Sequence, residues 1–575
     1  MEKREVVKIL SEISTLLELK GENPFKSRSY SNAARVLEGT PDDLAALTSD
    51  DRLEGLKGIG EGIGKKIREL ATTGTLVYYE ELKSGFPPGI LEMLRIPNLG
   101  PKRVKILYEK LDVKSVAELE YACNENRLLT LPGFGEKSQD NILKGIELVR
   151  RSSNQFLFSD AWEEAEPLLE ALRASRKVAE ASVAGSLRRR KEVVKDIDIV
   201  AASEHPEDVM DLFCTHTSVD EVLEKGSTKS NVRLKCGIAV DLRIVPVEAY
   251  PFLLHHMTGS KNHNIAMRSR AQKMGLKMSE WGLFDKSGRS MACRDEKEIF
   301  AALGLDEIQP EMREDMGEIE AAEEHALPAL ISREDLAGVL HCHTHYSDGI
   351  STVEEMVKRA AELGFAYIGI SDHSQSAGYA GGLKEADLQK QWKEIEQVQR
   401  KYPSIRILKG TESDILVDGS LDYPDAILRK FDFVVASIHS RFNMDEDEMT
   451  ARILKAIENP YTTIVGHPTG RLLLGRDPFK VNIDKMLTAA RKRGVAIELN
   501  ANPQRLDLDW RFLKKAKEMK VAITINPDAH SVHGISDVEY GCGIARKGWL
   551  EAGDVLNTKD AAELTRFAEA HRGHS

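Results

Sequence analysis

The sequence has no long hydrophobic run and few cysteines. No stretch of its 575 residues approaches the roughly 18 uninterrupted apolar residues of a membrane-spanning helix. The first residues, MEKREVVKIL, lack the basic-then-apolar pattern of a secretory signal. We therefore expect no membrane partner and a cytoplasmic location. The cysteines lie far apart without a CxxC pair, which argues against both a disulfide framework and a zinc ribbon.

The chain also lacks an excess of basic residues. Lys plus Arg is 80 and Asp plus Glu is 92, a net charge of −12. More than half of this acidity lies in residues 311–340, which hold 2 basic and 9 acidic side chains and are predicted to form a solvated linker. Because the remainder is nearly neutral, net charge does not exclude nucleic acid. The length suggests about four domains at roughly 150 residues each.

Three similar glycine turns interrupt the helical pattern of the first 150 residues. They are LKGIGEGIGKKI at 56–67, IPNLGPKRV at 96–104 and LPGFGEKSQ at 131–139. A glycine turn before a helix start exposes backbone N–H groups that can bind a phosphate. The pattern therefore predicts helix-hairpin-helix units that grip a DNA backbone, although each glycine could instead only end a helix. The expected DNA contacts are Gly58, Gly60, Gly100, Lys102, Gly133 and Gly135.

A lysine of the first turn is a candidate nucleophile. Lys66 follows the turn, and Lys26 and Tyr30 lie upstream of it. A lysine near other cations can have a lowered pKa and form a Schiff base with a sugar aldehyde. The alternative is that these lysines only make the surface soluble.

Three aspartates are predicted to share one face of a sheet. Asp196 and Asp198 alternate on the strand IDIVAA, and Asp241 ends a second apolar strand. Neighbouring carboxylates repel unless cations lie between them, so this pattern favours two hard divalent ions that hold a triphosphate. Ser186 and the nearby Arg189 could bind the triphosphate tail. A solvated strand end is the alternative reading of the aspartates.

From residue 338 onward, short β-rich runs alternate with amphipathic helices. The seven runs are GVLHCH, AYIGIS, IRILKGT, DFVVASI, TTIVG, VAIELN and VAITIN, a pattern that predicts a βα barrel. Nine potential metal ligands lie just past the strand ends, where such a barrel has its active site. They are His341, His343, Asp348, His373, Glu412, His439, His467, Asp528 and His530, with Asn500 a weaker candidate.

These ligands are too many for one ion. A single histidine at a strand end is usually structural, but six at five strand ends favour metal binding. Nine N and O ligands suit three divalent ions and hydrolysis of phosphoesters. Cys342 lies between two ligands and is expected to point away from them. Arg471 and Arg505 are candidate phosphate contacts, with surface arginines as the alternative.

The first 315 residues resemble the family X DNA polymerases. The resemblance rests on the glycine turns, GS followed by DxD and a distant Asp, and TGS followed by Asn and Arg. It implies that Asp196, Asp198 and Asp241 are catalytic metal ligands for two Mg²⁺ or Mn²⁺ ions in a palm. It further implies that Ser186, Arg189, Gly259, Asn264 and Arg268 bind the nucleotide, that Lys66 is the lyase lysine, and that Lys26 and Tyr30 form its 5′-phosphate pocket. The sequence departs from the family at His256, Met257 and Gly62.

The C-terminal part resembles the PHP domain, named for polymerase and histidinol phosphatase. HxHxxxSD, SDH, GxE, SIHS, GHP and DAH carry the resemblance. It implies that Glu412 bridges ions and that His341, His343 and Asp528 hold one ion. His439 and His467 would hold a second, and Asp348, His373 and His530 a third. Mn²⁺ is our expectation here, and Zn²⁺ or Fe²⁺ also suit imidazole.

The two resemblances predict a multidomain α/β chain. Helical helix-hairpin-helix domains precede a palm with a mixed β-sheet and a C-terminal distorted (βα)7 barrel. The expected domains are an N-terminal DNA-binding domain at 1–85, a second helix-hairpin-helix part at 86–150, the palm at 151–250, a thumb-like part at 251–315, the acidic linker at 316–337 and the barrel at 338–575.

The expected function is DNA-directed DNA polymerisation that fills short gaps in repair. The barrel would act as a 3′–5′ exonuclease, with cutting of abasic sites or removal of 3′-phosphates as further options. The expected partners are gapped or primer-template DNA and dNTPs, bound by a monomer associated with the nucleoid. Two alternatives remain open: a DNA-end phosphoesterase whose polymerase half only binds DNA, and a repair scaffold without catalysis.

Overall fold

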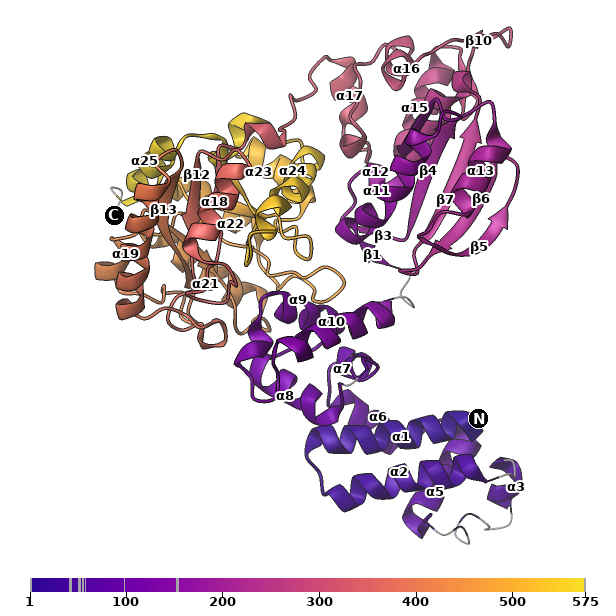
Figure 1. The fold of residues 1–575 in the computed structure, drawn as a ribbon, viewed down its shortest axis with the longest axis vertical. Coiled ribbons are helices and arrows are strands. Elements are labelled where there is room, and N and C mark those ends of the chain that lie inside the picture. Colours follow the sequence, from indigo (N-terminus) through magenta and orange to yellow (C-terminus); the bar gives the residue numbers. More distant parts are fainter. Residues whose placement is uncertain are drawn as a thin grey trace. The chain divides into compact units, whose positions relative to one another are not determined.

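The chain divides into two compact units, residues 1–149 and residues 150–575. The structure is a computed structural model, drawn in Figure 1, that describes residues 3–40, 44–49, 53, 56, 58–97, 99–150 and 155–572. Within these residues, no helix is both long and apolar enough to cross a membrane. The boundary expected at residues 150 and 151 adjoins residues 151–154, which lie outside the described residues.

The first unit is helical and has one hydrophobic core. In its first helix Val6, Leu10, Ile13 and Leu17 recur every three or four residues and are fully buried, which aligns them on one face. The second helix begins after Asn23, whose side chain accepts a hydrogen bond from the backbone. The elements are α1 (Lys3–Lys20), α2 (Pro24–Gly39), α3 (Leu44–Ser49), α5 (Glu61–Thr73), α6 (Val77–Ser84), α7 (Gly89–Met93), α8 (Pro101–Leu111), α9 (Val116–Asn124), η1 (Arg127–Thr130) and α10 (Glu136–Arg150).

The second unit begins with a five-stranded mixed sheet, in the part of the chain that the sequence predicts to be the palm and that keeps this name below. Its strand order is β2-β4-β7-β6-β5, and β4 and β7 run parallel while the other neighbours are antiparallel. The strands are β2 (Glu180–Val183), β4 (Asp196–Ala202), β5 (Val219–Lys225), β6 (Lys229–Leu234) and β7 (Ala239–Val245). Figure 1 shows helices α11 (Phe158–Ala174) and α13 (Pro206–Cys214) alongside this sheet. A short pair, β1 (Phe156–Leu157) and β3 (Val193–Val194), precedes β4.

A smaller helical and β part follows the palm. Its helices and strands are α14 (Tyr250–Thr258), α15 (Lys261–Lys273), β8 (Lys277–Ser279), β9 (Gly282–Phe284), β10 (Ser290–Met291), α16 (Glu296–Ala302), η3 (Pro310–Met312) and α17 (Glu318–Glu323). Its core joins Met267, Leu283 and Phe300. Trp549 of the barrel packs into the same core, so the two parts share buried surface.

The acidic segment 311–340 differs from the solvated linker that its charge predicts. Arg313 and Glu318 are fully buried. Arg313 pairs with Glu296 at 2.5 Å, and Glu318 lies 2.8 Å from Nδ1 of His263. Glu318 is internal because the distant imidazole of His263 pairs with it, and Arg313 because the distant carboxylate of Glu296 does, which local charge counting cannot reveal.

The C-terminal part is the parallel barrel that the sequence predicts. Its seven strands are hydrogen-bonded in sequence order, and Figure 1 shows helices around them. The strands are β11 (Gly338–Val339), β12 (Tyr367–Ile370), β13 (Arg406–Asp414), β14 (Phe433–Ser437), β15 (Ile464–Val465), β16 (Ala496–Asn500) and β17 (Ile523–Asn526). A parallel bridge between Cys342 and Ala529 joins the two ends of the sheet. The main helices are α18 (Val353–Glu362), α19 (Glu385–Lys401), α20 (Asp425–Leu428), α21 (Glu446–Glu458), α22 (Ile483–Arg493), α23 (Trp510–Glu518), α24 (Val538–Lys547) and α25 (Ala561–Arg572).

The barrel has an inner and an outer core. Phe433 belongs to the inner core, and its ring occupies space that a Cβ at Gly369 or Gly410 would fill. The outer core lies under the helices and includes Cys342. The thiol of Cys342 therefore faces away from its neighbours His341 and His343, as the strand period predicts.

Candidate metal centres and nucleotide site

The nine predicted barrel ligands gather at the carboxyl ends of the strands. Eight of them are buried, and His439 has only 6% of its side chain exposed. Eight of the nine, all except His467, fall into three overlapping groups, and within each group the donor atoms lie within 4.8 Å of one another. The groups are His343 with Asp348, His373 and His530; His341 with His343 and Asp528; and His373 with Glu412 and His439.

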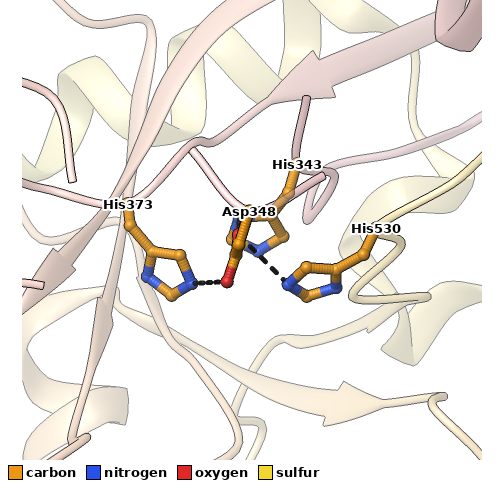
Figure 2. A group of neighbouring side chains, drawn as sticks. All are labelled: His343, Asp348, His373 and His530. Carbon is orange, nitrogen blue, oxygen red and sulfur yellow. Dashed lines mark ion pairs between the residues drawn. The ribbon is translucent and has the colours of Figure 1, made fainter. Parts of the chain in front are cut away.

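The first group is built around one carboxylate. Asp348 Oδ2 lies 3.3 Å from His373 Nε2, and Asp348 Oδ1 lies 3.4 Å from His530 Nε2 (Figure 2). The rings of His343 and His530 stack with centroids 4.2 Å apart. The donors therefore converge from three loops onto a space of ionic size.

The three observed groups resemble the predicted ligand sets, but some ligands belong to two groups. His341, His343 and Asp528 meet as expected, and His343 also joins the set expected for the third ion. Glu412 lies among several imidazoles, with Oε1 3.0 Å from Nε2 of His467. The predicted bridging place of Glu412 therefore coincides with the centre of the cluster.

The cluster fits cations better than it fits protons alone. His341 Nε2 and both ring nitrogens of His343 are buried and form no hydrogen bond with any described residue. A buried polar atom without a partner costs about 1–3 kcal/mol. Nitrogen and oxygen donors of this kind are those that divalent ions such as Mn²⁺, Fe²⁺ and Zn²⁺ accept.

Electrostatics keep the carboxylates of the cluster ionised. Burial alone would raise the pKa of Glu412, but the nearby imidazoles of His439, His373 and His341 outweigh it and hold this pKa well below its ordinary value. For His343, burial and the charges of neighbouring imidazoles both lower the pKa. A neutral His343 beside ionised carboxylates is the protonation state that a metal ligand needs.

Two acids missed by the sequence reasoning orient the ligands. Glu498 Oε1 accepts a hydrogen bond from His341 Nδ1 at 2.8 Å, and its Oε2 accepts one from the backbone N of His467 at 2.7 Å. Asp414 holds His439 Nδ1 at 2.7 Å in the same way. Such contacts fix the tautomer and would leave Nε2 of each ring as the atom that binds a metal ion. The sequence did carry one signal for them, because Glu498 and Asp414 are acidic residues within the largely buried strands β16 and β13.

The two candidate arginines of the rim are buried, unlike surface arginines. Arg505 places Nε 3.5 Å from Asp528 Oδ2. Arg471 donates to the carbonyl oxygens of Arg505 and Leu506 and to Asp509 Oδ2. Arg471 therefore supports the loop that brings Arg505 to the cluster.

The three palm aspartates lie together as predicted. Asp198 and Asp241 are direct neighbours on the parallel strands β4 and β7, and Asp196 lies two residues before Asp198. Gly185 closes the site from one side, because a Cβ at this position would overlap the carboxylate of Asp198. Ser186, half-buried, follows this glycine.

Crowding of like charges raises two carboxyl pKa values in the palm. Burial, followed by the charges of Asp196 and Asp241, raises the pKa of Asp198 to about 6. Burial and Asp241 also raise the pKa of Asp196. A divalent cation would relieve this repulsion, so the donor set fits the ions that the sequence predicts.

The predicted nucleotide residues are only partly exposed. Arg189 is buried; it donates to the carbonyl of Thr258 and lies 3.0 Å from Glu314. Asn264 donates to the carbonyl of His256 at 2.7 Å. Arg268 is exposed and lies 3.2 Å from His256 Nδ1. Gly259 ends α14 next to the Arg189 guanidinium.

In the first unit the predicted 5′-phosphate residues meet around Tyr78, which sequence reasoning missed. The Lys66 ammonium lies 5.0 Å and the Lys26 ammonium 5.7 Å from the centre of its ring. The ring of Tyr30 stacks on it at 6.2 Å. Hydrogen bonding with Tyr78 is the main cause that raises the pKa of Lys26. The sequence carried no signal beyond a tyrosine near the motif.

Four glycines of the three turns are not required by internal packing. Gly60 and Gly100 precede the first residues of α5 and α8, and Gly135 precedes α10. A Cβ at any of these positions, or at Gly133, would meet no atom within 4 Å. Open space at a helix start fits approach by an external phosphate. Lys102 is exposed nearby, and Gly58 adopts a φ of +113°.

Four protein families match parts of the chain. A helix-hairpin-helix domain matches residues 1–76, and a SAM-like helix-hairpin-helix tandem matches residues 90–147. The DNA polymerase beta thumb matches residues 253–314. The PHP domain matches residues 340–502.

Curated relatives match either nearly the whole chain or a third to two fifths of it. A DNA polymerase/3′-5′ exonuclease PolX of Bacillus subtilis (strain 168) is 38% identical over 570 residues, which cover 99% of each chain. A probable phosphatase of Thermoanaerobacter sp. (strain X514) is 33% identical over 244 residues, 40% of this chain and 94% of the relative. A probable phosphatase of Acetivibrio thermocellus is 30% identical over 203 residues, 33% of this chain and 79% of the relative.

The barrel cluster predicts a selective loss of metal. His341→Ala should lower the metal content of the purified protein by about one ion per chain, because it removes a donor near Glu412 and Asp528. His345→Ala is the matched control, since His345 is exposed and lies outside the three groups. Elemental analysis of both proteins measures the effect. Equal metal content in the two variants would refute the assignment.

Proposed function

The chain belongs to the family of the Bacillus subtilis DNA polymerase/3′-5′ exonuclease PolX, and on that premise we propose that it extends DNA primers at the palm and hydrolyses DNA 3′ ends in the barrel. The observation that carries the proposal is the presence of two separate donor clusters in one such chain. Asp196, Asp198 and Asp241 form one, and the nine barrel ligands form the other.

In the palm, the three aspartates would hold two Mg²⁺ or Mn²⁺ ions. When bound, such ions lower the pKa of the primer 3′-hydroxyl and neutralise the leaving pyrophosphate. Ser186 and Arg189 would bind the triphosphate, and Gly259, Asn264 and Arg268 would border the incoming nucleotide. Gly185 supports this geometry because its missing side chain lets the loop of Ser186 approach Asp198.

In the barrel, the cluster would hold three divalent ions. They supply a hydroxide at neutral pH and stabilise charge on a phosphoester. The family and the donor set imply use of divalent metal. Mn²⁺ is our choice, with Zn²⁺ and Fe²⁺ as the rivals that imidazole also suits. Arg505 supports the proposal, because its guanidinium lies at the cluster where a phosphate would bind.

The DNA substrate follows from the first unit. Its glycine turns grip phosphates without reading bases, which suits short gaps of any sequence. Gapped or primer-template DNA and dNTPs are therefore the proposed partners, in gap-filling repair at the nucleoid. The barrel would also cut at abasic sites and remove 3′-phosphates, since both reactions hydrolyse a phosphoester of DNA.

A second candidate function is a DNA-end phosphoesterase whose palm only binds DNA. The observation that favours it is the likeness of the barrel to probable phosphatases. Unlike the main proposal, it predicts that loss of a palm carboxylate leaves the protein's only activity, phosphoester hydrolysis, intact.

The two activities should separate by mutation. On a one-nucleotide gapped duplex with a 5′-labelled primer in Mn²⁺, Asp241→Ala should reduce primer extension at least about a hundredfold, because one of the three carboxylates that would hold the palm ions is removed. Its shortening of primers without dNTPs should stay as in the wild type, and His341→Ala should show the opposite pattern. Gel electrophoresis resolves both. If neither the wild type nor any variant extends the primer, the result favours the phosphoesterase function.

Primer extension should weaken in acid earlier than an ordinary aspartate predicts. The pKa of Asp198 is about 6, so its carboxyl is increasingly protonated below that pH and holds no cation. At low Mg²⁺ the extension rate should fall about tenfold per pH unit below 6. High Mg²⁺ should move the midpoint to lower pH, because the ion competes with the proton. A midpoint pH of primer extension that does not change with the Mg²⁺ concentration would contradict the assignment of Asp198 as a metal ligand.

Lys66 should form a Schiff base with a 5′-deoxyribose phosphate. On a nicked duplex carrying this group, borohydride should trap a covalent complex with the wild type and with Lys65→Ala, but not with Lys66→Ala. Lys65 is the control because it adjoins Lys66 and pairs with Glu61 at 2.7 Å. Denaturing gels reveal the complex. Trapping that persists in Lys66→Ala would assign the chemistry to another amine.

A further inference from the structure

The palm and the barrel meet through helix α24. Gly543 of this helix contacts the side chain of Arg190, where a Cβ would collide with the arginine stem. Arg546 places Nε 2.8 Å from Glu311 Oε1. Lys547, the last residue of the helix, reaches the segment next to the palm aspartates. The helix thus presents one face to the polymerase body.

Lys547 is a buried cation whose polar partners lie outside the barrel. Only 1% of its surface is exposed, and its Nζ lies 4.6 Å from the centre of the Trp510 ring. Nζ donates to the carbonyl oxygen of Arg189 at 3.0 Å and to Glu314 Oε1 at 2.5 Å. Burying an ammonium is costly unless it is paired and hydrogen-bonded, so these contacts are strong constraints.

Glu314 links this lysine to the side chain of Arg189. Its Oε1 accepts from Lys547 and also from Arg189 Nε at 3.0 Å. Burial opposes ionisation of Glu314, but the charges of Lys547 and Arg189 outweigh it and lower its pKa. A carboxylate shared by two cations leaves the trio with a net positive charge, so Arg189 is held without being neutralised.

Arg189 in turn contacts the turn beside the incoming nucleotide. Its guanidinium donates to the carbonyl of Thr258 and lies against Gly259. Lys547 therefore fixes both the backbone, through the Arg189 carbonyl, and the side chain, through Glu314. If Lys547 served only to stabilise the barrel, it would not need to contact both the Arg189 carbonyl and Glu314.

We propose that Lys547 of the barrel is a positioning residue for nucleotide binding in the palm, acting through Glu314 on Arg189. The inference rests on the proposed polymerase function, in which Arg189 binds the triphosphate. The barrel is then part of the support of the nucleotide site as well as a second active site.

The test uses the full chain with Lys547→Met, which keeps the stem and removes the charge. The dNTP KM of primer extension should rise about tenfold, with kcat and barrel exonuclease activity within about twofold of the wild type, since one charged contact is lost. Lys517→Met is the matched control. Lys517 is a half-buried lysine whose polar contacts, among the residues that the structure describes, are the carbonyl of Trp549 and the carboxylates of Glu551 and Asp554, all in the barrel. It should leave KM unchanged.

A double variant separates positioning from general damage. Lys547→Met should add little to the KM of Arg189→Ala, because the lysine acts through that arginine. Additive effects, an unchanged KM, or a parallel loss of exonuclease activity would each overturn the proposal. Should Lys547→Met fail to fold, Glu314→Gln removes the shared charge while keeping the shape, and the same rise in KM is expected.

Hydrogen exchange gives a readout that does not depend on activity. Lys547→Met should speed amide exchange in residues 186–192 and 258–262, whereas Lys517→Met should not. A wild-type protein that extends no primer would refute the polymerase function. Unchanged exchange in those segments would refute the positioning role by itself.

Discussion

A buried carboxylate stays ionised when a cation, an imidazole or several hydrogen-bond donors lie within a few ångström of it. The barrel satisfies this condition with imidazoles, which surround Glu412 and Asp348 on several sides. The palm does not, and two of its aspartates accordingly have raised pKa values. The same constraint therefore separates the barrel site, whose carboxylates are kept ionised by imidazoles and can receive metal, from the palm site, whose carboxylates depend on cations to stay ionised.

The constraint also explains the contact between palm and barrel. Acids of the segment 311–340 are neutralised by partners from three directions: His263 from α15, Arg189 from the palm and Lys547 from α24. Each pair lies far apart in sequence and buried in the fold. Through Glu311, Glu314 and Glu318 the segment is thus an electrostatic junction between the polymerase body and the barrel.

Much of both sites could be predicted from sequence because strand period and strand ends determine them. Alternation placed Asp196 and Asp198 on one face, and the repeated strand-and-helix pattern placed the barrel histidines on one rim. Residues that act through a ligand were missed. Glu498 and Asp414 lie inside strands and resemble other buried positions, and Tyr78 carries no motif. The solvated linker was predicted from local charge, although Glu318 and Arg313 are neutralised by residues distant in sequence.

The orientation of Cys342 limits which metals the barrel can retain. Its thiol is fully buried among the apolar side chains under the helices, and burial raises its pKa far above the ordinary value. The sulfur therefore faces away from the proposed ion sites, although Cys342 is adjacent in sequence to the predicted ligands His341 and His343. Thiophilic metals such as Cu⁺ or Cd²⁺ gain no soft donor there, because thiolate is the ligand that selects them. The predicted ligands at the rim therefore offer only nitrogen and oxygen donor atoms, even though Cys342 lies within the HxH motif.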